Sequence, residues 1–268
     1  MADLKPETFE LSRPEDGIVV ATLNRPDSLN SMTVAMFAEL EELAFTLGDD
    51  DDVRVLVITG AGKAFCAGYD LDDAGELADL TALGMLERQE HAARALSAIR
   101  SLRIPVIAAI NGAAAGGGLA LALAADIRLA SEKAKFNAAF VRIGLSAGDL
   151  GSSWLLPRII GPARASEIAY TGRFVFAEEA EKIGLVNRVV PADALLDETL
   201  ALARQIRANS PGGVQLSKRA LQANMEVTSY AAALELENRG QALLTRGEDM
   251  PEALAAFKEK RAPKFTGR

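Results

Sequence analysis

Apolar residues recur at two different spacings along the chain, and these divide it into predicted strands and predicted helices. Short segments rich in apolar residues predict strands at Phe9–Leu11, Gly17–Leu23, Val53–Thr59, Val106–Ile110, Ile127–Ala130, Ala134–Phe136 and Leu185–Val190. Apolar residues at helical spacing predict helices over residues 34–47, 91–102, 152–160, 163–171, 177–183 and 193–208. Strands that alternate with helices predict an α/β core of parallel or mixed sheets with right-handed crossovers.

The pattern changes after the Ser210–Gly213 segment, beyond which it is helical to the end of the chain. We therefore predict an α/β core over residues 1–210 and a helical region over residues 211–268. A region this small buries little surface alone, so we expect it to pack on its own core or on a neighbouring subunit. Within the core, residues 71–90 are acidic and interrupted by glycine, which predicts a mobile connector.

Residues 104–126 join a predicted strand to a predicted helix through a cluster of glycines, Gly116, Gly117 and Gly118. A glycine has no Cβ, so its backbone N–H can approach a ligand closely, and a helix N-terminus adds a partial positive charge. The spacing matches neither the dinucleotide fingerprint nor the P-loop. The same glycines would equally serve tight packing of the helix, so both interpretations stay open.

The composition excludes several classes of function. The net charge of −8 argues against nucleic acid as a partner, because phosphate binding needs clustered Lys and Arg. One histidine and one cysteine exclude a zinc site of the usual Cys/His type and an intrachain disulfide framework, and we expect no metal. No apolar run is long enough to cross a membrane, and residues 1–17 lack signal-peptide or transit-peptide character. We therefore expect a cytoplasmic protein.

Short motifs occur along nearly the whole chain, each weak alone but specific in order and spacing. They are Asn24-Arg25-Pro26, Lys63–Leu71, Pro105–Gly112, Gly116–Gly118, Ala125-Asp126, Lys135-Phe136, Ile159–Gly161, Thr171–Arg173, Glu178–Ala180 and Gly184–Val186. In this order they resemble the crotonase (enoyl-CoA hydratase/isomerase) superfamily. The resemblance implies a spiral of ββα turns followed by a C-terminal helical region, and a homotrimer or a dimer of trimers. It also implies an acyl-CoA thioester substrate, so that coenzyme A enters with the substrate and no separate cofactor is expected.

By motif position, the resemblance assigns an oxyanion hole to the backbone N–H groups of Ala67 and Gly117. Such donors stabilise the negative charge that develops on a thioester oxygen, each by roughly 3 kcal/mol of barrier. The adenine and pantetheine contacts of the family cluster at Asp70 and Leu71. The other candidate contacts with substrate or CoA are Arg25, Lys63, Ala64, Gly68, Gly116, Phe140, Trp154, Lys260 and Arg261.

The chain departs from the family pattern where hydratases hold a water molecule between two glutamates. Ala120 and Phe140 stand at those two positions, and neither can carry a proton. Asp149 lies at the offset where dienoyl-CoA isomerases, hydroxyisobutyryl-CoA hydrolases and chlorobenzoyl-CoA dehalogenases carry a working aspartate, after allowance for a one-residue insertion. The alternative interpretation of Asp149 is a cap for the helix that begins near Ser152.

Two other reactive side chains are interpreted as structural. We expect Cys66, next to Ala67, to be a small buried residue and not a nucleophile. His91 stands in the region where the dehalogenases carry a histidine, but out of register, and we expect it on the surface of a helix.

These features together predict an enzyme that processes an acyl-CoA thioester, either a lyase or an isomerase. A single acid, Asp149, favours isomerisation, because one group can remove and return a proton. Three alternatives stay open: hydration by a variant mechanism, hydrolysis or dehalogenation through Asp149, and a CoA-thioester binding protein that has lost the chemistry. A Rossmann oxidoreductase is disfavoured by the spacing of the glycines.

Overall fold

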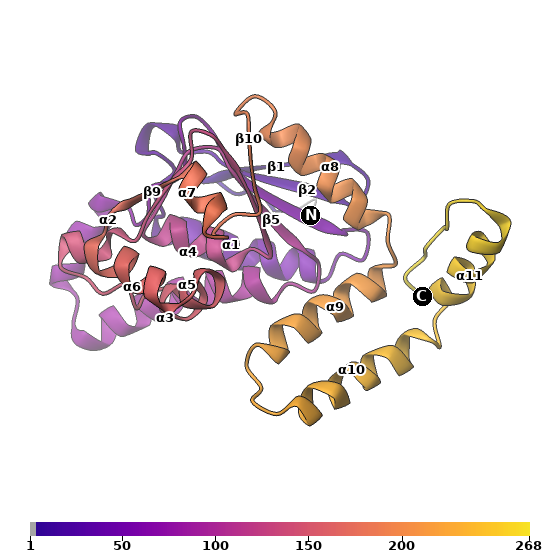
Figure 1. Cartoon of the computed structure of the whole chain (residues 1–268). Coiled ribbons are helices and arrows are strands. Elements are labelled where there is room, and N and C mark those ends of the chain that lie inside the picture. The colour runs from indigo at the N-terminus through magenta and orange to yellow at the C-terminus, as the bar shows by residue number, and fades with distance from the viewer. Residues whose placement is uncertain (1–3) are drawn as a thin grey trace.

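The fold is built from two sheets with helices around them, as seen in a computed structural model that describes residues 4–268 (Figure 1). Residues 1–3, which are part of the segment expected to lack signal-peptide character, lie outside the described residues. The strands are β1 Phe9–Glu15, β2 Ile18–Leu23, β3 Val55–Gly60, β4 Ala64–Cys66, β5 Val106–Ile110, β6 Ala113–Ala115, β7 Ile127–Ser131, β8 Lys135–Asn137, β9 Phe174–Phe176 and β10 Arg188–Val190.

Helices connect these strands and form the whole C-terminal part. The α-helices are α1 Val34–Gly48, α2 Leu71–Gly75, α3 Ala82–Ser101, α4 Gly117–Ala124, α5 Ser152–Ile160, α6 Pro162–Thr171, α7 Ala177–Lys182, α8 Leu195–Arg207, α9 Pro211–Asn224, α10 Tyr230–Leu244 and α11 Asp249–Glu259. The 3-10 helices are η1 Pro26–Ser28, η2 Glu76–Asp79 and η3 Ala139–Ile143.

Successive turns of the chain add one strand to each of the two sheets. The larger sheet has the order β1-β2-β3-β5-β7-β10 and the smaller sheet has the order β4-β6-β8-β9. Thus β3 is followed by β4, β5 by β6 and β7 by β8, and within each sheet these strands pair in parallel. Helices follow each pair of strands. The predicted α/β spiral of ββα turns is therefore confirmed.

The inner strands of the larger sheet, β2, β3, β5 and β7, are buried on both faces, which explains why they are rich in apolar residues. Alternate residues such as Val55, Val57 and Ile107 pack against Leu200 and Ala203 of α8. The intervening residues of the same strands face the main core, to which α1, α3 and α4 also contribute. Successive residues of these strands thus alternate between the two faces of the sheet, as expected of a β-strand.

The segment of residues 71–90, predicted to be an irregular, mobile connector, is largely helical. Residues 71–79 form α2 and η2, and α3 begins at Ala82, well before the predicted start at His91. The Thr81 side chain caps α3 by accepting a hydrogen bond of 3.1 Å from the Gly84 N–H. The sequence did not predict this cap or the start of the helix, because the first turns of α3 are largely exposed and have no regular stripe of buried apolar residues.

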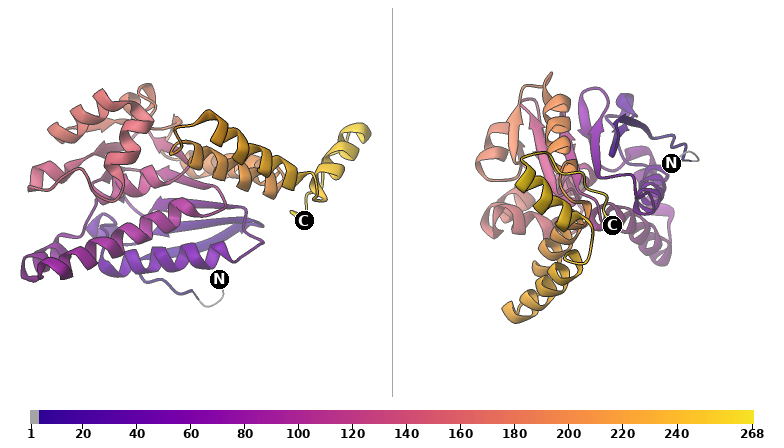
Figure 2. Two further views of the ribbon diagram at one scale, coloured as in Figure 1. Left: turned by 90° about the horizontal axis from the view of Figure 1, so that it is seen from below. Right: turned by 90° about the vertical axis from the view of Figure 1, so that its right-hand side faces the viewer.

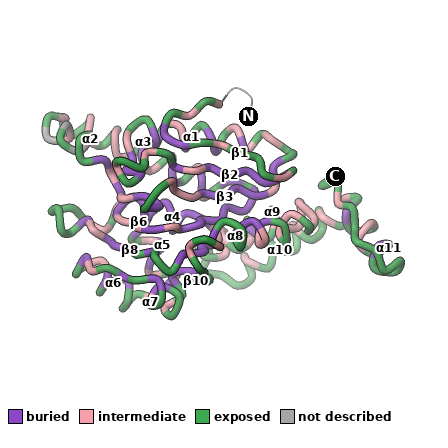
Figure 3. The backbone as a smooth tube through the Cα atoms, turned by 90° about the horizontal axis from the view of Figure 1, so that it is seen from above, coloured by how far each residue is buried: buried purple, intermediate pink, exposed green. Residues whose placement is uncertain are grey.

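The C-terminal helices α9, α10 and α11 project from one end of the core (Figure 2). None of the residues of α10 is buried (Figure 3). Among its exposed side chains are the large apolar ones of Tyr230 and Leu243. By contrast, α9 is tied to the core by the buried Lys218, whose Nζ lies 2.8 Å from the Ile104 carbonyl oxygen and 2.7 Å from Asp126 Oδ2. The boundary at residue 210 stays a prediction.

Candidate active site

Glycine stands at each of the three consecutive positions 116–118 for a different structural reason. Gly116 has a φ of 51°, in the left-handed region that favours glycine, and its N–H donates to the Asn137 carbonyl oxygen at 2.9 Å. A Cβ on Gly118 would lie 2.1 Å from the Cys66 carbonyl oxygen, so this glycine allows α4 to pack against β4. Gly117 has more room, because a Cβ there would lie 3.1 Å from Met32 Sδ. Close packing therefore explains Gly118, whereas Gly117 has the room that a bound ligand would need.

Two backbone N–H groups lie side by side at the N-terminus of α4. The position of a Cβ on Gly68 is 3.5 Å from the Gly117 nitrogen, and that of a Cβ on Gly117 is 3.8 Å from the Tyr69 nitrogen. Within residues 4–268, neither the Tyr69 N–H nor the Gly117 N–H has a hydrogen-bond acceptor. Two unpaired donors beside a helix N-terminus suit an anionic oxygen. We call Tyr69 N–H and Gly117 N–H the donor pair.

The assignment of Ala67 as one of the two donors is wrong. The Ala67 N–H donates to the Leu29 carbonyl oxygen at 3.0 Å and is therefore already bonded. Gly68, with a φ of 102°, lies between Ala67 and Tyr69 and turns the chain, so that the Tyr69 N–H faces Gly117 instead. Backbone donors leave no side-chain signature, so the sequence marks this loop without showing which of its N–H groups is free.

The loop of residues 66–71 is held by charged and aromatic contacts. The Asp70 carboxylate is buried and accepts hydrogen bonds from Ser31 Oγ at 2.7 Å and Arg25 Nη1 at 2.9 Å. The hydrogen bond from Ser31 and then that from Arg25 hold the pKa of Asp70 below its usual value, against the opposing effect of burial. The Tyr69 ring stacks on Phe37 with centroids 6.1 Å apart. Asp70 and Arg25 are thus joined to each other, and their contacts with CoA stay predictions.

Asp149 lies in the loop that connects η3 to α5, and its side chain points to α3. Gln89 Nε2 donates a hydrogen bond to Asp149 Oδ1. The interpretation of Asp149 as a side-chain cap is wrong, because α5 has Gly151 at its N-cap with no side-chain hydrogen bond. Burial raises the pKa of Asp149, while hydrogen bonds from Gln89 and from the Leu150 N–H act in the opposite direction. A half-buried carboxyl group with a raised pKa is a candidate acid or base.

The backbone after Asp149 is in an unusual conformation. Leu150 has a φ of 49° and Gly151 a φ of 81°, so two consecutive residues are left-handed. For leucine this conformation costs about 1–2 kcal/mol. It places Leu150 Cδ1 3.4 Å from the position of a Cβ on Gly117. Such strain is often found at functional sites, and here it places the residue after Asp149 next to Gly117.

The two positions that carry glutamates in family hydratases are apolar and buried. Ala120 is fully buried in α4, and Phe140 is buried in η3. The Phe140 ring comes to 3.9 Å from the position of a Cβ on Gly116, so it lies beside the donor pair. Its contact with a substrate stays a prediction.

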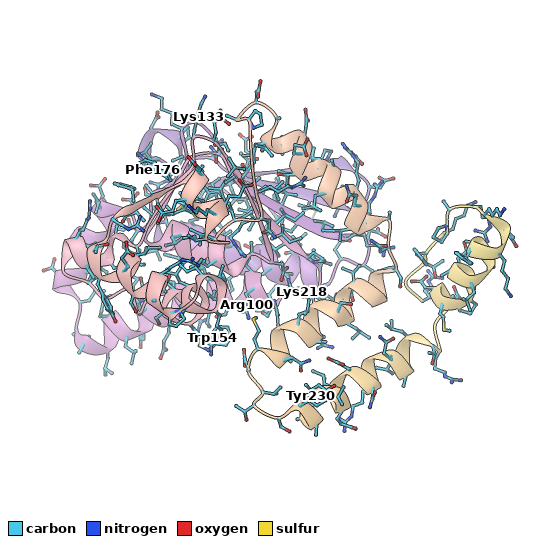
Figure 4. All side chains as sticks on the ribbon, viewed as in Figure 1. Arg100, Lys133, Trp154, Phe176, Lys218 and Tyr230 are labelled. Carbon is cyan, nitrogen blue, oxygen red and sulfur yellow. The ribbon has the colours of Figure 1, made fainter. Side chains whose placement is uncertain are left out.

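The placement of Trp154 argues against the predicted contact with substrate. Its ring lies 3.6 Å from the Arg158 guanidinium and 5.5 Å from that of Arg100. Arg100 is eleven residues after Gln89 on α3, which corresponds to about 16 Å along the helix. Figure 4 shows Trp154 and Arg100 together at the lower edge of the core, on the side of α9. Trp154 is therefore separated from the Gln89–Asp149 contact.

The other predicted contacts with substrate or CoA lie in two regions of the chain. Lys63 and Leu71 are exposed, whereas Ala64 is buried and its carbonyl oxygen accepts hydrogen bonds from the Asn30 and Asn111 side chains. In the C-terminal region, Lys260 ends α11 with a left-handed backbone, and Arg261 pairs with Glu252 and Glu259. The structure contains nothing that tests their predicted contacts with CoA.

The two reactive side chains that were interpreted as structural lie as expected. Cys66 is fully buried, and burial raises the pKa of its thiol to about 12, so the thiolate is not accessible at neutral pH. His91 is exposed on α3. In the part of the chain that the structure describes, no group of three or more His, Cys, Asp or Glu could hold a metal ion. Within the same residues, no helix is long and apolar enough to cross a membrane.

Comparison with known proteins gives extensive matches. The model of the enoyl-CoA hydratase/isomerase family matches residues 13–268. A probable enoyl-CoA hydratase of Mycobacterium tuberculosis is 46% identical, covering 96% of this chain and 91% of that protein. The 1,2-epoxyphenylacetyl-CoA isomerase of Escherichia coli is 41% identical, covering 97% and 99%. The crystal structure of an enoyl-CoA hydratase from Bacillus anthracis superposes with a TM-score of 0.93 at 35% identity, covering 98% and 100%.

Proposed function

Since the chain belongs to the enoyl-CoA hydratase/isomerase family, we propose that it is an acyl-CoA isomerase in which Asp149 carries the proton. The donor pair, Tyr69 N–H and Gly117 N–H, binds the thioester carbonyl oxygen. Asp149 faces the acyl chain from the neighbouring loop. The observation that carries this proposal is the combination of two free backbone donors with one carboxyl group of raised pKa on the adjoining loop.

The donor pair makes proton removal next to the thioester easier. When a C–H bond at C2 of the acyl chain breaks, its electron pair moves toward the carbonyl oxygen and forms an enolate. Two fixed N–H donors, helped by the partial positive charge at the N-terminus of α4, stabilise that oxygen as its charge grows. Because the donors are already oriented, they need no rearrangement during the reaction.

Asp149 then completes the isomerisation alone. Its carboxylate takes the proton from C2 of a 3-enoyl-CoA, and the resulting carboxylic acid returns a proton to C4 while the double bond moves to C2–C3. A raised pKa brings the carboxyl group nearer to the working pH, where it exchanges protons most effectively. Hydration needs a second proton carrier, and Ala120 and Phe140 supply none at the positions where family hydratases carry one.

Hydration by a variant mechanism is the second candidate, favoured by the relatives that are named enoyl-CoA hydratase. Purified enzyme is given 3-enoyl-CoA and 2-enoyl-CoA separately, with no metal or cofactor added. Chromatography separates the isomeric products, and mass spectrometry detects any addition of water or loss of CoA. We expect a 2-enoyl-CoA of unchanged mass from the first substrate and little addition of water to the second. Rapid hydration of 2-enoyl-CoA, release of free CoA, or binding without turnover would contradict the proposal in favour of the hydratase, the hydrolase or the binding protein.

Residue 149 is tested in the same assays with Asp149→Asn, which keeps the shape and removes the proton carrier. Glu90→Gln is the matched control, because Glu90 is an exposed acid of α3 one residue from Gln89. We expect turnover to be lost only in the first variant. Equal loss in both variants, or full activity of Asp149→Asn, would remove Asp149 from the mechanism.

We further propose that the C-terminal helices pack on a second copy of the chain, in a homotrimer or a dimer of trimers. The support is the set of large apolar side chains exposed on them: Leu221, Tyr230, Leu243, Leu254 and Phe257. Single molecules rarely leave so much apolar surface uncovered. Light scattering of the purified protein should give three or six times the mass of one chain, and a mass of one chain would contradict this.

A further inference from the structure

We propose that Gln89 is a positioning residue, which orients the Asp149 carboxylate and keeps it in its ionised, proton-accepting form. This inference rests on the function proposed above for Asp149. It concerns a residue in the segment that the sequence predicted to be a mobile connector, and the motifs of the sequence give it no role. Its basis is the hydrogen bond from Gln89 Nε2 to Asp149 Oδ1, across 60 positions of the chain.

The helix that carries Gln89 is anchored firmly enough to fix another side chain. Ala92, Ala95, Leu96 and Ile99 of α3 are buried in the main core, and α3 packs along α1. Gln89 itself is half-buried, so its amide group is partly shielded from water. A donor on an anchored helix holds its acceptor in a narrower range of orientations than a donor on a loop does.

The same turn of α3 also holds the other side of the site. Arg88, the preceding residue, donates from Nη1 to the Tyr69 hydroxyl at 3.1 Å. Consecutive helical residues point about 100° apart, so one turn reaches two loops at once. Arg88 therefore holds the loop that carries the Tyr69 N–H, and Gln89 holds the loop that carries the base. The spacing between oxyanion and base is set in part by α3.

The chemical nature of Gln89 suits a base that must stay ionised. Its amide donates a hydrogen bond but has no proton to exchange near neutral pH, so it cannot take over the role of Asp149. The groups that shift the pKa of Asp149 are burial, Gln89 and the Leu150 N–H, and within the described residues no charged side chain does so. Arg88, the cation next to Gln89, is directed to Tyr69. Gln89 is thus the main side chain that favours the carboxylate.

The test compares the pH dependence of kcat/KM in wild type, Gln89→Met and Gln89→Glu with a 3-enoyl-CoA substrate. Gln89→Met has a similar length but no donor, so we expect kcat to fall about tenfold or more with KM nearly unchanged. The acidic limb of the profile should move to higher pH, because the lost hydrogen bond stabilised the ionised form. Gln89→Glu brings a second carboxylate against Asp149 and should move the limb further in the same direction.

Three controls separate this inference from a structural effect and from the proposed function. Arg88→Met should lower the rate by less than about threefold without moving the acidic limb, and Glu90→Gln should leave rate and profile as in wild type. Melting temperatures and the affinity for CoA verify that each variant is folded. If Gln89→Met keeps the wild-type profile while Asp149→Asn is inactive, the role of Gln89 is refuted and that of Asp149 stands. If Asp149→Asn is active, the proposed function itself fails.

Discussion

Two loops bring an aspartate near the glycines that open α4, and they hold it in opposite ways. In the loop of residues 66–71, Asp70 accepts hydrogen bonds from Ser31 and Arg25, and these partners hold its pKa below the usual value. In the loop of residues 144–151, Asp149 accepts hydrogen bonds from the neutral amide of Gln89 on α3 and from the Leu150 N–H, and burial raises its pKa. One carboxylate is stabilised as a charge, and the other is left ready to take up a proton.

The difference in their partners distinguishes an aspartate that holds a loop from one that can carry a proton, which the residue type alone cannot do. A carboxylate paired with a guanidinium is a poor proton carrier near neutral pH, but it fixes the loop that carries the Tyr69 N–H. A carboxylate without a charged partner is less stable when ionised and therefore exchanges protons more readily. The strained backbone at Leu150 lies in the loop of Asp149, the carboxylate without a charged partner.

The largest effect is expected from Asp149→Asn. Turnover should fall by about 10²–10⁴-fold, the usual contribution of a positioned acid or base. Because the folded pKa of Asp149 is raised, its favourable contribution to folding is complete below the unfolded pKa and is lost as the pH rises through the folded value. At neutral pH the variant should therefore melt at a temperature equal to or above that of wild type. A lower melting temperature with retained activity would reverse the assignment.

Gly117→Ala should have the next largest effect. Its Cβ would lie 3.1 Å from Met32 Sδ and 3.4 Å from Leu150 Cδ1, where it narrows the space in front of the donor pair. We expect kcat to fall by about 10²-fold, as when one oxyanion donor is removed, with a small loss of stability. Gly118→Ala is the contrasting variant, since its Cβ would lie 2.1 Å from the Cys66 carbonyl oxygen and should reduce the amount of folded protein. Similar behaviour of the two variants would refute the distinction between them.

Asp70→Asn should act mainly on stability. It weakens the hydrogen bonds with Arg25 and Ser31, and we expect a loss of about 1.5–3 kcal/mol in the free energy of unfolding. Because the folded pKa of Asp70 is lowered, its stabilising contribution is present above the unfolded pKa and is lost as the pH falls through the folded value. Denaturant titrations at several pH values should show a shallower acidic decline in the variant. An unchanged decline would place the stabilising charge elsewhere.

The smallest effect is expected from Tyr69→Phe. The backbone donor remains, and only the hydroxyl that accepts from Arg88 is lost. We expect kcat to change by less than about threefold, because a single neutral acceptor contributes little in a partly exposed position. Steady-state kinetics measure this directly, and a loss as large as that of Gly117→Ala would make the side chain, not the N–H, the functional group of Tyr69.

Much of the core followed from the sequence, because its elements are long and regular. β3 and β5 are buried on both faces and appear as unbroken apolar runs, and α8 has the amphipathic spacing of a helix that covers a sheet. β4, β6 and β9 span three residues each, too few for any periodicity, and were not predicted as strands. These short strands build the sheet beside the site, so the least predictable elements are among the most important ones.

The site itself was only partly accessible from sequence. Gly117 and Asp149 are marked by their motifs, whereas the choice between Ala67 and Tyr69 depends on the positive φ of Gly68, a backbone angle that residue type does not determine. Gln89 was missed because its partner is 60 positions away in a segment without regular pattern. Local patterns report burial and turns, but a contact between distant segments becomes visible only in the fold.

The central claim, that paired backbone donors bind a thioester oxygen opposite a single working carboxylate, is tested most directly by a crystal structure. Asp149→Asn with a bound enoyl-CoA should trap the complex. We predict that the thioester oxygen lies about 2.7–3.1 Å from the nitrogen atoms of both Tyr69 and Gly117, with residue 149 facing the acyl carbons. An oxygen bound away from these two nitrogens, or an acyl chain directed away from residue 149, would contradict the account.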